Sequence, residues 1–149
     1  MAQTPVLALG FAALLKPLLS DGALPGWYKE LVATRMSVLQ GSAYAVAGHL
    51  LSAWQTGATE VHIVAVKADF ESGPFTEAEK LDLRCADRLH HSARAIDDAF
   101  YAKLKGVYND PQIVELIATA SVFEFFARFV DALRIPLTPA PKNSLAGQI

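Results

Sequence analysis

Hydrophobic residues recur at three- and four-residue steps along most of the chain, and this is the period of an α-helix. Most of the periodic stretches begin after a residue that suits a helix N-cap or at a proline. The predicted helices run from Pro5 to before Ser20, from Pro25 to Gln40, from Ser42 to Thr56, from Thr59 through Val66, from Thr76 through Leu89, through Ile96, Phe100 and Leu104, and from Asp110 through Val130. The last carries the longest apolar stripe and is expected to be the central core helix.

One segment fits two kinds of structure. Val61-His62-Ile63-Val64-Ala65-Val66 has the β-branched composition of a buried strand. No second strand is predicted to pair with it, so we expect a short helix that Thr59 caps. The expected fold class is therefore all-α.

The length of the chain suits a single domain. At 149 residues it has the usual size of one globular domain, and it can bury a sizeable core. We expect a helical domain over residues 1–135. Residues 136–149 contain Pro136-Leu137-Thr138-Pro139-Ala140-Pro141 and have no helical period, so they predict a Pro-rich tail that could lie over a neighbouring subunit.

The composition is more apolar than that of an average soluble domain. Hydrophobic residues make up 52% and charged residues 19% of the chain, and the mean hydropathy is +0.27. Average soluble domains have ~45–50% apolar and ~25% charged residues. An apolar excess is expected where part of the surface is buried between subunits. We therefore expect a homo-oligomer.

The charge pattern limits the possible partners. The formal net charge is −2, and the 13 basic and 15 acidic residues are interspersed without runs, so nucleic acid and anionic membranes are not expected partners. The apolar start, Met1 to Leu19, lacks a basic region before it and is shorter than the ~20 residues of a membrane span. A small-molecule substrate and copies of the same chain remain as the expected partners.

The sequence contains few cysteines and histidines that could support redox chemistry or bind a metal ion. Cys85 is the only cysteine, which excludes an intrachain disulfide and a CxxC couple and favours a cytoplasmic location. Its place on an apolar stripe predicts a buried, unreactive thiol. His90 and His91 would point ~100° apart on a helix and could not easily share a metal ion. We expect no metal site and no cofactor, because phosphate-binding glycine loops are also missing.

Acid–base residues gather in one stretch of the sequence. Ser42, Ala45 and His49 are spaced at three and four residues and would share one helix face. Glu30 belongs to the preceding predicted helix. A short connection at Gly41 would fold the two helices against each other, so Glu30 and His49 are expected to meet.

This stretch resembles the carboxymuconolactone decarboxylase and alkylhydroperoxidase-D-like superfamily. The family pattern is a glutamate, eleven residues, and then Cys-x-x-Cys-x-x-x-His, often with a tyrosine just before the second cysteine. On this sequence the pattern falls on Glu30, Ser42, Tyr44, Ala45 and His49. The resemblance continues through Gly57-Ala58-Thr59-Glu60 and through Asp110 to Pro136. It implies an alkylhydroperoxidase-D-like helical domain.

The departures from the family pattern change the expected chemistry. In the peroxidase branch, one thiol attacks the peroxide and the second thiol resolves the product, and neither step is possible with Ser42 and Ala45. Serine lacks a thiolate and would need a well-aligned base to act as a nucleophile. A thiol peroxidase is therefore excluded, and the acid–base pair remains.

The resulting hypothesis is a cofactor-independent decarboxylase, other lyase or isomerase for a small carbonyl or carboxylate compound. His49 would move a proton, Glu30 would orient it, and Tyr44 or Arg128 would hold the developing enolate or a carboxylate. Ser42 and Ala45 would line the substrate site, where small side chains leave space for a ligand.

Structural roles are open for each of these residues. His49 could be a buried histidine with a structural hydrogen bond, and Glu30 could pair with Lys29 or Arg35 at the surface. Ser42 could be a helix N-cap. Tyr44 could belong to the core or to an interface, and Arg128 could form an ion pair with Glu124 at i,i+4 spacing.

The alternative function is a non-catalytic helical binding or assembly module that kept the fold and lost the redox chemistry. Its apolar excess would then serve an oligomer interface. An enzyme needs Glu30 and His49 within hydrogen-bond reach and facing a cavity, whereas a module would have them apart or sealed by packing.

Overall fold

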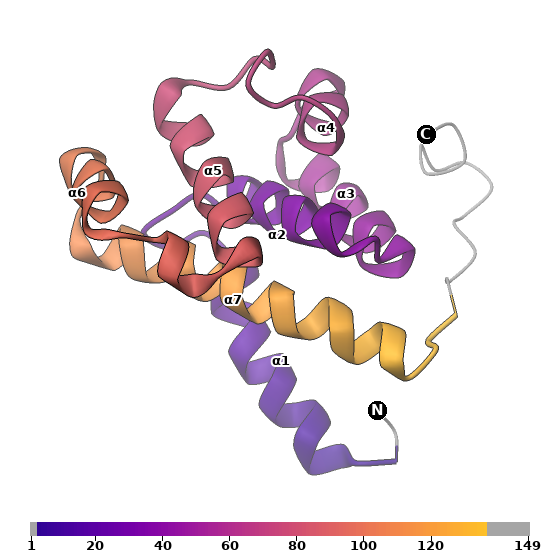
Figure 1. Ribbon diagram of the computed structural model, residues 1–149. Coiled ribbons are helices and arrows are strands. Elements are labelled where there is room, and N and C mark those ends of the chain that lie inside the picture. The colour runs from indigo at the N-terminus through magenta and orange to yellow at the C-terminus, as the bar shows by residue number, and fades with distance from the viewer. Residues whose placement is uncertain (1–2, 137–149) are drawn as a thin grey trace.

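The computed structural model describes residues 3–136, which form seven α-helices and one short 3₁₀-helix and no strand (Figure 1). The all-α prediction is confirmed. The elements are α1 (Pro5–Leu19), α2 (Gly26–Gln40), α3 (Ala43–Thr56), α4 (Glu60–Lys67), α5 (Glu77–His91), η1 (Ala93–Ala95), α6 (Asp98–Val107) and α7 (Asp110–Ala132). The predicted tail from residue 137 onward lies outside the described residues.

Helix α2 occupies the centre of the bundle. It packs against α3, α4, α5 and α7, and ten of its fifteen residues are buried. Figure 1 shows it crossing behind α5 and beside α3, with α7 running below. The sequence predicts α7 as the central helix, but α2 is the more completely enclosed of the two, since only seven of the 23 residues of α7 are buried.

Side-chain caps fix several helix ends. Thr76 and Glu79 form the predicted capping box at the start of α5, with Thr76 Oγ1 accepting from the Glu79 amide at 3.2 Å. The pair Asp110-Pro111 predicts Asp110 as the N-cap of α7. Asn109 holds that position instead and accepts from the Gln112 amide at 3.0 Å, so Asp110 is the first residue of the helix.

The helix predicted through Ile96 is shorter than expected. Ile96 lies between η1 and α6, and α6 begins only at Asp98. The side chain of Asp97 accepts from the Phe100 amide at 2.7 Å and so caps α6 there. Phe100 and Leu104 are buried on α6 as the pattern indicates.

The ambiguous segment after Thr59 is helical. Within α4, Ile63 and Val66 are buried while Val61 and Val64 are more than half exposed, which is a helical and not an alternating pattern. The backbone amide of Thr59 donates to His62 Nδ1 at 3.2 Å, so the start of α4 is tied by its own side chains. The prediction of a helix here is confirmed.

Helix α1 projects from the rest of the bundle (Figure 1). Of its fifteen residues only Leu18 is buried, and Val6 and Leu9 are 85% and 72% exposed. Phe11 holds the helix to α7 through ring contacts with Phe125 and Phe129. In the described part of the chain, no helix is both long enough and apolar enough to cross a membrane.

Candidate functional site

Glu30 and His49 meet inside the α2–α3 pair, as the sequence predicts. Glu30 Oε2 lies 2.7 Å from His49 Nδ1, and Ser52 Oγ donates to Glu30 Oε1 at 2.5 Å. The Glu30 residue is 1% exposed, so its carboxylate is held away from solvent. Each oxygen of this carboxylate therefore has one side-chain partner on α3.

The turn between the two helices brings these groups together. Gly41 ends α2 with φ of 70°, a left-handed conformation that glycine adopts without strain, and its amide donates back to the Val38 carbonyl oxygen. The chain then reverses into α3. His49 and Ser52 are three residues apart on α3 and so lie on one face, which is turned toward Glu30.

The contact with Glu30 fixes the orientation of the imidazole. A carboxylate only accepts hydrogen bonds, so Nδ1 of His49 donates and the lone pair of the neutral ring lies on Nε2. The ring also meets the edge of Phe123 on α7, with centroids 4.4 Å apart. The side chain keeps 12% of its surface exposed. Among the described residues, none forms a hydrogen bond with Nε2, which leaves that nitrogen for proton transfer.

The structural alternatives for Glu30 are wrong. Lys29 points the other way and pairs with Glu115 at 3.1 Å, and Arg35 pairs with Asp87 at 2.6 Å. Lys29 is fully buried, which the sequence does not predict. Its ammonium also donates to the Pro17 carbonyl oxygen at 3.0 Å, so it ties the end of α1 to α7.

Ser42 is buried, but its hydroxyl does not cap α3. It occupies the N-cap position with no side-chain cap bond, and Oγ donates instead to Asp131 Oδ1 at 2.8 Å. The hydroxyl therefore joins the start of α3 to the end of α7. Ala45 is buried one turn before His49 on the same helix. The substrate-lining roles predicted for Ser42 and Ala45 stay predictions.

Among the described residues, neither Tyr44 nor Arg128 forms a hydrogen bond with Glu30 or His49. Tyr44 is half-buried and precedes His49 by five residues, which turns it ~140° around α3 from the histidine. The Arg128 side chain is 69% exposed and binds Glu124 Oε1 at 3.0 Å through Nε, which confirms the i,i+4 ion pair. The roles proposed for both residues in holding an enolate or a carboxylate stay predictions.

The sequence analysis does not predict two hydrogen-bonded groups, Ser52 and the pair His90–Glu124. The three-residue spacing of Ser52 from His49 is nevertheless a usable signal once Glu30 is placed opposite that face. His90 and Glu124 form a second histidine–carboxylate pair, in which His90 Nδ1 lies 2.8 Å from Glu124 Oε2. This second pair is more open, with the two side chains 28% and 18% exposed.

The structure also bears on the thiol and on metal binding. Cys85 is buried, as predicted, and burial together with the nearby Asp82 charge raises the pKa of its thiol to about 12. Within residues 3–136, no group of three or more histidine, cysteine, aspartate and glutamate side chains is arranged to hold a metal ion.

Comparison with known proteins places this arrangement in a family. Residues 5–87, more than half of the chain, match the model of the carboxymuconolactone decarboxylase family. No curated protein matches the sequence.

Several solved structures share the fold. A protein of unknown function from Agrobacterium tumefaciens, proposed to be an antioxidant defence protein of the AhpD type, is 21% identical with a TM-score of 0.81, over 93% of this chain and 95% of that one. A peroxidase-related protein from Ralstonia eutropha with an AhpD core is 17% identical, with a TM-score of 0.84 over 99% and 78%. The debrominase Bmp8, in complex with 2,3,4-tribromopyrrole, is 22% identical, with a TM-score of 0.84 over 99% and 79%. At these identities the likeness concerns the fold alone.

Proposed function

Because the chain belongs to the carboxymuconolactone decarboxylase family, we propose that it is an acid–base enzyme that acts on a small carbonyl or carboxylate compound through the Glu30–His49 pair. The observation that supports this most is the buried Glu30 carboxylate, which accepts from Nδ1 of a partly exposed histidine and leaves Nε2 for the substrate. A glutamate in that position orients the ring and stabilises the imidazolium that forms when Nε2 takes a proton.

The family name suggests a decarboxylation as the first reaction to consider. The bond between the carboxylate carbon and its neighbour breaks, carbon dioxide leaves, and the electron pair enters the conjugated carbonyl as an enolate. Protonated His49 then delivers the Nε2 proton to the carbon, and solvent returns a proton to the ring. An isomerase would use the same nitrogen twice, first to remove a proton beside the carbonyl and then to replace it on another carbon.

Ser52 has a positioning role in this proposal. Its hydroxyl donates to the Glu30 oxygen that His49 does not use, so the carboxylate is held from two sides in a place where rotation would break the contact with the imidazole. Without the serine, one buried carboxylate oxygen would have no partner on α3, and such a loss is costly. Ser52 does not itself need to touch the substrate.

The variants His49→Ala and His90→Ala test the proposal as a matched pair. Each removes an imidazole whose Nδ1 faces a glutamate, at 2.7 and 2.8 Å respectively. With carboxymuconolactone as the probe, we expect His49→Ala to lose ~10²–10⁴-fold in kcat, the usual contribution of a general acid or base. His90→Ala is expected to keep wild-type turnover, and Ser52→Ala to lose less than His49→Ala.

The readouts separate catalysis from folding. Carbon dioxide release measures decarboxylation, and exchange of substrate protons for deuterium measures proton transfer at carbon even where no net reaction follows. Circular dichroism must show that His49→Ala keeps its helices. Turnover that survives His49→Ala in a folded protein would refute the proposal, and so would wild-type protein that neither turns over nor exchanges protons of such compounds.

Wild-type protein without turnover or proton exchange would favour the alternative function, a helical assembly module. The exposed apolar residues of α1 are the specific observation that supports this alternative, since such a surface suits association between copies of the chain.

A further inference from the structure

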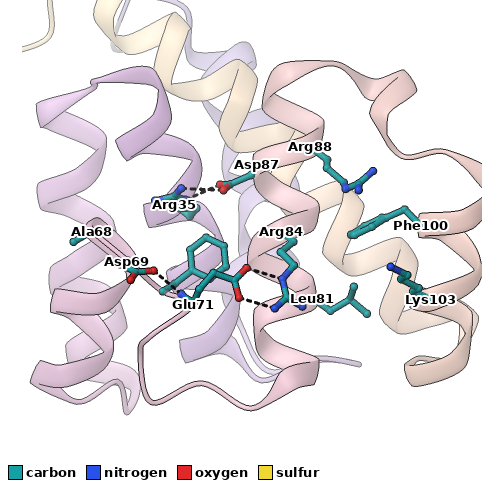
Figure 2. A pocket seen from close by; sticks show the side chains of 11 residues that line it. Arg35, Ala68, Asp69, Glu71, Leu81, Arg84, Asp87, Arg88, Phe100 and Lys103 are labelled. Atoms are coloured by element: carbon teal, nitrogen blue, oxygen red, sulfur yellow. Dashed lines mark hydrogen bonds and ion pairs between the residues drawn. The ribbon is translucent and has the colours of Figure 1, made fainter.

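A cavity lies away from the Glu30–His49 pair. It has a volume of about 590 Å³ and is bounded by the loop after α4, by α5 and by α6, with Arg35 of α2 at its back (Figure 2). None of its lining residues belongs to α3, which carries His49 and Ser52. The volume falls within the ~300–1,000 Å³ that is usual for small-molecule sites.

The cavity combines an apolar floor with a basic rim. Phe70, Leu81 and Phe100 contribute buried side chains to its lining. The lining also holds four cations and three carboxylates, an excess of one positive charge (Arg35, Arg84, Arg88, Lys103, Asp69, Glu71 and Asp87). An apolar molecule that carries one negative charge would match both features.

The three carboxylates already have partners. Asp87 binds Arg35 through both oxygens, at 2.6 and 2.9 Å, and Glu71 binds Arg84 through both oxygens, at 2.6 and 2.5 Å (Figure 2). Asp69 accepts from the backbone amides of Glu71 and Ser72 and so closes its own turn. The two ion pairs offset the charges of Glu71 and Asp87. Asp69 keeps its negative charge, so Arg88 and Lys103 carry the net positive charge of the lining.

Two cations lack a close carboxylate. Arg88 donates to the Ala95 carbonyl oxygen at 2.8 Å, its guanidinium lies over the Phe100 ring at 4.4 Å, and the nearest carboxylate oxygen, on Asp97, is 3.9 Å away. Lys103 lies one turn after Phe100 on α6, and no acceptor in the described part of the chain is bonded to it (Figure 2). Its ammonium is therefore the group best placed to receive an anion.

We infer that this cavity binds a small monocarboxylate with an apolar or aromatic body. The carboxylate pairs with Lys103 and faces Arg88, and the body lies against Phe100 and Leu81. A single carboxylate cancels the excess charge of the lining, whereas a cation would meet net repulsion. The apolar floor adds affinity that a purely inorganic anion does not gain.

Benzoate is the probe for this site, and Lys103→Gln with Lys105→Gln are the matched variants. Both lysines are exposed on α6, but only Lys103 lines the cavity. Isothermal titration calorimetry is expected to show benzoate binding that Lys103→Gln weakens ~5-fold or more, since hydrogen bonds to charged groups are among the stronger ones. Lys105→Gln is expected to bind benzoate as wild type does, and Lys103→Glu more weakly than Lys103→Gln.

Three comparisons locate the ligand and define its class. Amide signals of Lys103 and Phe100 should move in ¹H–¹⁵N spectra with benzoate, and His49→Ala should keep the affinity, which separates this site from the proposed acid–base centre. Benzamide and inorganic phosphate should both bind more weakly than benzoate. Equal binding by phosphate would overturn the assignment to an apolar carboxylate. The site would be refuted if wild type did not bind benzoate, or if Lys103→Gln bound it with unchanged affinity. It would also be refuted if only signals around His49 moved.

Discussion

Asp82 places a carboxyl group inside the protein where no hydrogen-bond donor meets it. The residue is fully buried on α5, and within the described chain neither of its oxygens has a hydrogen-bond partner. The nearby Tyr28 hydroxyl donates instead to the Glu79 carbonyl oxygen at 2.5 Å. Burial raises the pKa of Asp82 to about 7, although the nearby hydroxyls of Tyr108 and Tyr28 act in the opposite direction.

This buried carboxyl predicts a pH dependence of stability. An unfolded aspartate ionises near pH 4, whereas the folded protein keeps the proton until about pH 7. The folded state therefore binds the proton more tightly, and the contribution of Asp82 to the free energy of unfolding falls as the pH rises from about 4 to about 7.

Replacing Asp82 with Asn should remove this penalty. We expect Asp82→Asn to gain up to ~3 kcal/mol of stability relative to wild type between pH 5 and pH 8, since the pKa of about 7 lies ~2 units above pH 5 and each unit corresponds to ~1.4 kcal/mol. The unpartnered amide reduces the gain, because a buried polar group without a hydrogen bond is itself costly. Urea unfolding at pH 5 and pH 8 measures the difference. A difference between variant and wild type that is the same at both pH values would contradict the prediction.

At the scale of the element, the helices predicted most accurately are those whose ends are set by nearby residues. The capping box of Thr76 and Glu79, the proline at the start of α1 and the glycines after α2 and α3 all act within a few residues, so the sequence contains the whole signal. The prediction of a helix through Ile96 is wrong, because its apolar spacing matches that of Phe100 and Leu104 although Asp97 caps α6 after it. Ser42 has the residue type of an N-cap, but its hydroxyl donates to Asp131, which lies 89 residues away in the sequence.

The same distinction explains how much of the candidate site was predictable. Glu30 and His49 lie on consecutive helices joined by a tight turn, so their meeting follows from spacing and the resemblance to the family pattern. Lys29 is different, because its burial depends on Glu115 of α7 and on the end of α1. The cavity beside α6 likewise combines α2, α5 and α6 with a loop, and no local pattern indicates that these residues converge.

Helix α4 offers a direct test of the segment that fits two kinds of structure. In the helix, Ile63 is 1% exposed and the adjacent Val64 is 58% exposed. We expect Ile63→Ala to lower the free energy of unfolding by ~2–5 kcal/mol, because it removes buried methyl groups and leaves a cavity. Val64→Ala should change it by less than ~0.5 kcal/mol, since its side chain lies at the surface. Denaturant titration compares them, and equal losses would contradict the observed register of α4.

At the scale of the whole molecule, α1 is the feature that a single chain leaves incomplete. Only its C-terminal half packs on the bundle, through Phe11, Leu15, Leu18 and Leu19, whereas Val6, Leu7 and Leu9 are exposed. Phe125 of α7, which meets Phe11, is itself 48% exposed. Contiguous apolar surface of this kind is uncommon on monomers and is typical of subunit interfaces. Among the described residues, α1 exposes four large hydrophobic side chains, Val6, Leu7, Leu9 and Leu14.

We therefore predict that the protein forms a homo-oligomer through α1 and the adjoining part of α7. Wild type is expected to sediment as a defined oligomer in analytical ultracentrifugation, and Leu9→Glu, at a position 72% exposed, should shift it toward the monomer, because burying an unpaired charge is costly. Val61→Glu is the matched control, since Val61 is 59% exposed but lies on α4. Wild type that sediments as a monomer, or equal dissociation by both variants, would contradict this interface. Leu9 belongs to α1, whereas Glu30 and His49 belong to α2 and α3. Loss of the oligomer in Leu9→Glu with retained proton transfer would therefore show that catalysis needs only one chain.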